Sequence, residues 1–114
     1  MINILVDECY AFDYLSILEV KKNVDQTKNF KQWKECFDYL KNQIPSIFDQ
    51  AISSPEYNDL YKSNLRTFDA VAKARSGGNI TAKEVDDCNM ERYNSKMAFQ
   101  AKFFPNAIIR EIKL

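Results

Sequence analysis

Three pairs of acidic residues stand one helical turn apart along the chain, a spacing that could support metal chemistry. The pairs are Glu35 with Asp38, Glu56 with Asp59, and Glu84 with Asp87. Carboxylates three residues apart project from the same side of a helix, and several such helices around a bundle can hold Mg²⁺ through oxygen ligands. The pattern therefore indicates a site for Mg²⁺ or Mn²⁺ as one alternative.

In this spacing the chain resembles the all-α nucleotide pyrophosphohydrolases, whose helices carry Glu-x-x-Glu and Glu-x-x-Asp pairs. The resemblance implies, as the alternative to our main prediction, a phosphohydrolase that acts on nucleotide phosphates with bound Mg²⁺. The positions of the acids favour a different interpretation. Glu56 and Glu84 fall in the first turns of predicted helices, where negative charge stabilises the helix dipole, and Asp38 lies off the apolar stripe of its helix. We therefore predict that the acids face water and that the protein has no cofactor.

The sequence lacks the residues that several other catalytic systems require. The sequence contains no histidine, which excludes Ser-His-Asp and Cys-His nucleophiles and histidine-ligated metals. Its two glycines are adjacent, Gly77 and Gly78, so neither a P-loop nor a dinucleotide-binding fingerprint fits. The cysteines Cys9, Cys36 and Cys88 are odd in number and widely spaced, which predicts buried thiols rather than disulfides or a zinc site. We predict no catalytic activity.

A polar stretch from 83 to 96 offers groups that could bind an anion. Asn89, Arg92 and Lys96 follow one another at spacings of three and four residues. Two cations and an amide on one helix face could receive a phosphate, a carboxylate or an acidic partner surface. Sequestration of a small nucleotide is therefore a second alternative. The simpler interpretation, which we favour, is that this face of the helix is exposed to water and carries surface ion pairs.

Aromatic residues make up 13% of the chain, more than a small helical core requires. Tyr10 and Tyr14 each join an apolar ring to a polar tip, a combination enriched at protein interfaces. Phe103 and Phe104 are adjacent, so on one helix their rings would point in different directions and one could face a partner. The aromatic residues either fill a core that is poor in alanine or form an interface, and both interpretations stay open.

Charge and hydropathy narrow the choice of partner and location. Sixteen basic residues balance sixteen acidic ones, which argues against a sequence-independent nucleic-acid binder and against a membrane-surface protein. The only apolar run near the N-terminus is Ile4–Val6, and nothing approaches a membrane span, so we expect a cytoplasmic protein. The leading prediction is a small interaction or regulatory protein that binds a protein partner or itself.

Hydrophobic periodicity predicts helices that carry all these candidates. The first spans about 8–22 and the second about 28–43, where Pro45 should end, kink or restart it before a short continuation over 46–52. Ser54 and Pro55 begin a third helix that stops at Gly77. Thr81 begins a fourth through a Thr-x-x-Glu capping box, and this helix runs to about 103.

These elements predict a single compact domain over 1–114. The fold class is mainly α, as a four-helix bundle or an orthogonal helical array. The tails 2–6 and 107–114 have β character and could form short strands that pair with each other or across a dimer.

Overall fold

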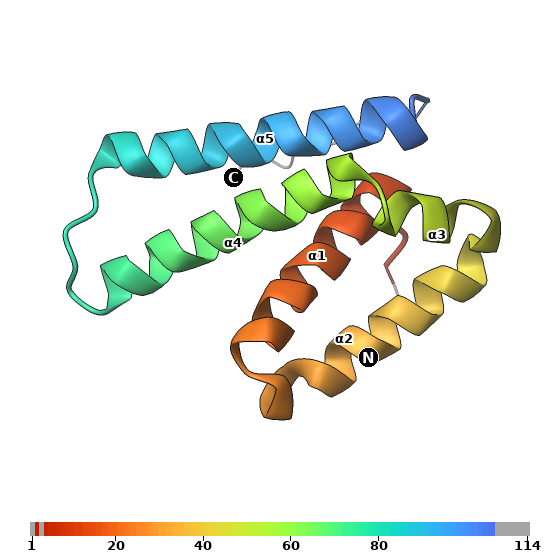
Figure 1. Cartoon of the computed structure of the whole chain (residues 1–114), viewed down its shortest axis with the longest axis horizontal. Helices are drawn as coiled ribbons and strands as arrows, with labels where there is room; N and C mark the ends of the chain where they lie inside the picture. The colour runs from red at the N-terminus through yellow and green to blue at the C-terminus, as the bar shows by residue number, and fades with distance from the viewer. Residues whose placement is uncertain (1, 3, 107–114) are drawn as a thin grey trace.

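The computed structural model describes residue 2 and residues 4–106, which form five α-helices (Figure 1). They are α1 (Glu8–Val24), α2 (Gln26–Gln43), α3 (Pro45–Ile52), α4 (Pro55–Arg75) and α5 (Ala82–Phe103). The described residues contain no β-strand. The prediction of a mainly α fold is confirmed.

Side-chain caps mark where four helices begin; at the start of α2 the Asp25 carboxylate accepts the Lys28 N–H at 3.3 Å. The Asp7 carboxylate accepts the Tyr10 N–H at 2.8 Å at the start of α1. The Ser54 hydroxyl accepts the Tyr57 N–H at 3.0 Å at the start of α4, and the Thr81 hydroxyl accepts the Glu84 N–H at 3.1 Å at the start of α5. Each cap satisfies a backbone donor that has no partner within the helix.

The end of α4 is a Schellman motif that depends on the two glycines. Gly77 has a φ of 82°, in the left-handed region that favours glycine. The Gly78 N–H donates to the Lys73 carbonyl at 2.8 Å, and a Cβ at Gly78 would lie 2.9 Å from that carbonyl oxygen. This turn sends the chain back towards α5.

Pro45 splits the second predicted helical stretch into two helices. Ile44 leaves the helical conformation, with φ −136° and ψ 59°, and Pro45 takes the first position of α3. A proline costs no hydrogen bond there, because the first N–H groups of a helix have no partner within it. Of the three outcomes predicted at Pro45, an end, a kink or a restart, the structure shows that one helix ends at Gln43 and another begins at Pro45.

Two antiparallel hairpins build the array (Figure 1). One hairpin is α1 with α2, and the other is α4 with α5. The two meet where α1 lies against α4 and, less extensively, α5, while α3 connects α2 to α4. The architecture is thus a helical array rather than a single bundle of four parallel axes.

The predicted N-terminal strand is absent from the described residues. Residues 4–7 adopt no regular structure, and Ile4, Leu5 and Val6 expose their side chains. A strand needs a paired neighbour to be stable in water, and the described chain offers none. The predicted C-terminal tail, 107–114, lies outside the described residues.

Phe12 of α1 lies at the centre of the apolar core and is fully buried. Its ring centroid is 6.0 Å from that of Phe48 on α3, 5.2 Å from Phe99 on α5, 6.5 Å from Tyr57 on α4 and 5.8 Å from Phe104. Tilted, edge-on and offset-stacked ring pairs at these distances are favourable. One side chain of α1 therefore contacts aromatic rings from every helix except α2.

We predict that Phe12→Ala lowers the free energy of unfolding by about 3–5 kcal/mol, because it removes apolar contacts and leaves a cavity. Phe30→Ala is the matched control, since the Phe30 side chain is 49% exposed. Its cost should stay below about 1 kcal/mol. Urea unfolding of both variants measures the difference, and equal losses would contradict a core centred on Phe12.

Candidate functional site

A buried polar cluster joins α1 to the other hairpin. Asp13 of α1 is only 6% exposed, and its Oδ1 accepts the side-chain amide of Asn64 on α4 at 3.0 Å. The same amide nitrogen lies 2.6 Å from the Ser16 hydroxyl. The Asn64 carbonyl oxygen accepts from Nε of Arg92 on α5 at 2.7 Å. Three helices are therefore linked through one asparagine.

Two cations of α5 neutralise the buried carboxylate. Arg92 Nη2 lies 3.5 Å and Lys96 Nζ 3.6 Å from Asp13 Oδ2. The predicted anion-binding trio is thus divided: Arg92 and Lys96 bind an internal carboxylate, whereas Asn89 lies nearer the start of α5 and is exposed. A phosphate bound to these two cations would have to compete with Asp13 for them.

Sequence reasoning missed Asp13 and Asn64. The available signal was the position of polar residues on an apolar face. Asp13 follows Phe12, and Ser16 follows Leu15, on the side of α1 that becomes buried. A carboxylate in such a place requires cationic or hydrogen-bonding partners from another element.

The six acids of the predicted metal site are dispersed over the surface. Asp38 pairs with Lys34 on its own helix at 2.9 Å, and Glu56 pairs with Lys102 of α5 at 3.0 Å. The hydrogen bond from Lys102 lowers the pKa of Glu56. The others, Glu35, Asp59, Glu84 and Asp87, are exposed on three different helices. No group of three or more acidic or cysteine side chains within the described residues could hold a metal ion.

The predicted aromatic interface residues fall into two groups. Tyr10 and Tyr14 of α1 are exposed, and the Tyr14 hydroxyl accepts the side-chain amide of Gln32 at 3.1 Å. Phe103 and Phe104 are both half-buried against the core. Phe104 follows the last residue of α5, with φ −137° and ψ 60°. Because the helix ends between them, both rings can turn towards the core.

The cysteines are thiols, two buried and one half-buried. Burial, with the nearby charge of Asp7 as the next cause, raises the pKa of Cys9 from 9.0 to about 11. Burial also raises the pKa of Cys36. Because the thiolate is the reactive form, neither side chain is suited to nucleophilic chemistry.

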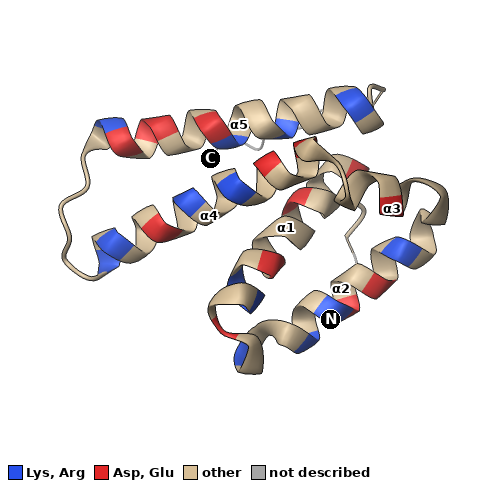
Figure 2. Ribbon diagram, viewed as in Figure 1, with Lys and Arg blue, Asp and Glu red and all other residues tan. Residues whose placement is uncertain are grey.

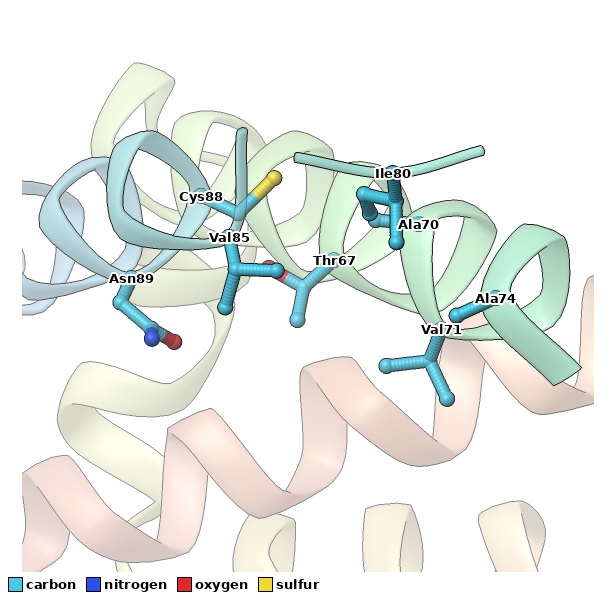
Figure 3. A pocket seen from close by; sticks show the side chains of 8 residues that line it. All are labelled: Thr67, Ala70, Val71, Ala74, Ile80, Val85, Cys88 and Asn89. Atoms are coloured by element: carbon cyan, nitrogen blue, oxygen red, sulfur yellow. The ribbon is translucent and has the colours of Figure 1, made fainter. Parts of the chain in front are cut away.

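An apolar groove lies between the far halves of α4 and α5 (Figure 3). We call residues 67–89, which form this end of the hairpin, the arm. The groove has a volume of about 140 Å³, and its lining includes Thr67, Val71, Ala74, Ile80, Val85 and Asn89. Side chains of both helices and of the loop between them contribute to it (Figure 3).

The arm is open because α1 covers only the other end of the hairpin. Among the hydrogen bonds of the described residues that join α1 to α4, the one farthest along α4 reaches Asn64. Beyond that point, residues 71–79 and 81–87 are all exposed. The Val71 and Val85 side chains at the groove are 44% and 42% exposed. The apolar face of the arm therefore has no covering element among the described residues.

No family model, curated protein or solved structure matches this chain.

We predict that Asp13→Ala lowers the free energy of unfolding by about 3 kcal/mol, because it leaves two cations and an amide without their shared acceptor. Asp38→Ala removes an exposed ion pair within one helix and should cost less than about 1 kcal/mol. Urea unfolding at neutral pH compares the two variants. An Asp13 variant as stable as the Asp38 variant would contradict a structural role for the cluster.

Proposed function

We propose that this chain is a small cytosolic helical interaction protein that acts by self-association and has no catalytic activity. The observation that carries the proposal is the uncovered apolar groove of the arm. Two facts about the described residues agree with it. Every buried side-chain nitrogen and oxygen has a hydrogen-bond partner, and Arg92 and Lys96, the two cations of the predicted anion site, both pair with Asp13.

A two-helix arm gains stability when a third element covers its apolar face. Most of the stability of protein helices comes from packing an amphipathic face rather than from the helix alone. In the arm, Cys88 of α5 is buried, and just outside the arm Arg66 and Glu91 form an ion pair between α4 and α5. Val71 and Val85 remain 44% and 42% exposed in this arrangement. A helix laid over the groove would bury both.

A second copy of the chain is the occupant that the charges favour. The end of α4 is basic, with Lys73 and Arg75, whereas the start of α5 is acidic apart from Lys83 (Figure 2). Two arms that face each other, with α4 of one copy over α5 of the other, would bring Arg75 towards Asp86 of the second copy. The net charge of zero means that no overall repulsion opposes this approach.

The size of the groove predicts a weak dimer. A stable interface buries about 800 Å² on each partner, and the nine residues from Thr67 to Arg75 span only about 13 Å of helix at 1.5 Å per residue. An interface confined to the arm would be smaller than that standard. We therefore expect self-association with a dissociation constant in the micromolar range.

Two observations bear on the cellular setting. The three cysteines are free thiols, which suits a reducing compartment and supports the cytosolic location in the proposal. No helix of the described residues is long and apolar enough to cross a membrane.

We predict that the average mass of the full chain rises towards that of a dimer as its concentration increases, and that Val71→Lys keeps it monomeric. The lysine would place a charge in the apolar contact. Val24→Lys, at the exposed C-terminal end of α1, is the matched control and should dimerise like the wild type. Sedimentation velocity measures all three proteins.

Sedimentation velocity also tests the proposed pairing of Arg75 with Asp86 of the second copy. Arg75→Glu and Asp86→Lys should each weaken the dimer, and the double variant should restore it. A wild-type chain that stays monomeric at its highest soluble concentration would contradict self-association. Failure of the double variant to recover would contradict the proposed facing of the two arms.

A further inference from the structure

A second, smaller hollow lies where α1, α2, α3 and α4 meet, away from the arm. Its volume is about 80 Å³, and it is lined by Leu15, Glu19, Trp33, Phe37, Ile52 and Tyr57. Three aromatic rings and one carboxylate thus line a space between four consecutive helices.

The carboxylate of the hollow has no cationic partner among the described residues. Glu19 is half-buried, and its Oε2 accepts the Tyr57 hydroxyl at 3.0 Å. No lysine or arginine of the described chain lies within ion-pair distance of it. The Tyr57 hydroxyl leaves most of the negative charge in place, because a phenol donates a hydrogen bond without neutralising the carboxylate.

The aromatic rings already bind a cation on one side. Lys22 Nζ lies 3.8 Å from the centroid of the Trp33 ring, a distance typical of a cation–π interaction. Lys22 follows Glu19 by one helical turn, yet its ammonium lies on the ring and not on the carboxylate. The Trp33 and Phe37 ring centroids are 5.1 Å apart. An ammonium group can therefore reach this aromatic surface.

We propose that the hollow binds a small ammonium cation, of the methylated kind that aromatic cages recognise. The rings of Trp33, Phe37 and Tyr57 would attract it through their quadrupoles, and Glu19 would supply the opposite charge. A space of about 80 Å³ is far below the 300–1,000 Å³ or so of sites for drug-sized ligands. It suits one ammonium head group rather than a nucleotide. This site is independent of the arm and of self-association.

Trp33 is the only tryptophan in the chain, so its fluorescence reports on the hollow directly. The experiment titrates the full chain with choline and, separately, with the neutral isostere of choline in which carbon replaces the quaternary nitrogen. We expect choline to produce a saturable change in fluorescence and the isostere to produce none over the same range. No saturable change, or equal binding of the isostere, would overturn the proposal.

Two variants and a control separate the contributions of charge and ring. Glu19→Gln keeps an acceptor for Tyr57 but removes the charge, and it should weaken choline binding about tenfold. Glu35→Gln removes an exposed carboxylate of α2 and should change nothing. Lys22→Met removes the internal cation from Trp33 and should tighten choline binding. Unchanged affinity in Glu19→Gln, or weaker binding in Lys22→Met, would contradict a cation site at this hollow.

Discussion

A buried carboxylate decides where α1 lies on the hairpin of α4 and α5. An ionised Asp13 is stable away from water only where cations and hydrogen-bond donors surround it. Asn64, Arg92 and Lys96 supply them at one position. If α1 were shifted along α4 by one turn, the Asp13 carboxylate would lose its hydrogen-bond donors and the two cations would be left unpaired. The aromatic cluster around the adjacent Phe12 supplies apolar burial at this junction, and the polar cluster fixes its register.

Fixing α1 in this register leaves the rest of the hairpin uncovered. The end of the hairpin near α1 contains the Asp13 cluster and the aromatic core around Phe12, whereas no hydrogen bond or ion pair of the described residues joins the arm to α1. The same register places Glu19 of α1 opposite Tyr57 of α4, with Trp33 of α2 beside them. Both the open groove and the small aromatic hollow therefore follow from the position of one helix.

Local chemistry made most of the fold predictable from the sequence. Ser54 with Pro55 and the Thr-x-x-Glu box at Thr81 define helix starts through side chains only three residues apart. The break at Pro45 has an equally local cause in the missing N–H of proline. The helices and their boundaries could therefore be predicted from the sequence without knowledge of the tertiary structure.

Features that depend on distant residues were not predictable in the same way. The partners of Asp13 lie 51 or more residues away on other helices, so periodicity cannot pair them. The position of the Phe104 ring depends on α5 ending one residue earlier, and the openness of the arm depends on where α1 stops. The N-terminal tail has β character in its sequence, but Ile4–Val6 has no strand to pair with among the described residues. Each of these outcomes depends on which elements meet.

Hydrogen exchange of the wild-type chain tests most directly whether the hairpin of α4 and α5 divides into an end held by α1, which we call the locked half, and an arm that needs a partner. In dilute solution, amides of α4 up to Asn64 and of α5 from Arg92 should exchange only through global unfolding, whereas amides of the arm should exchange much faster. Raising the protein concentration should protect the arm and leave the locked half unchanged. Arm amides that are as protected as the locked half in dilute solution, or that do not respond to concentration, would contradict the account.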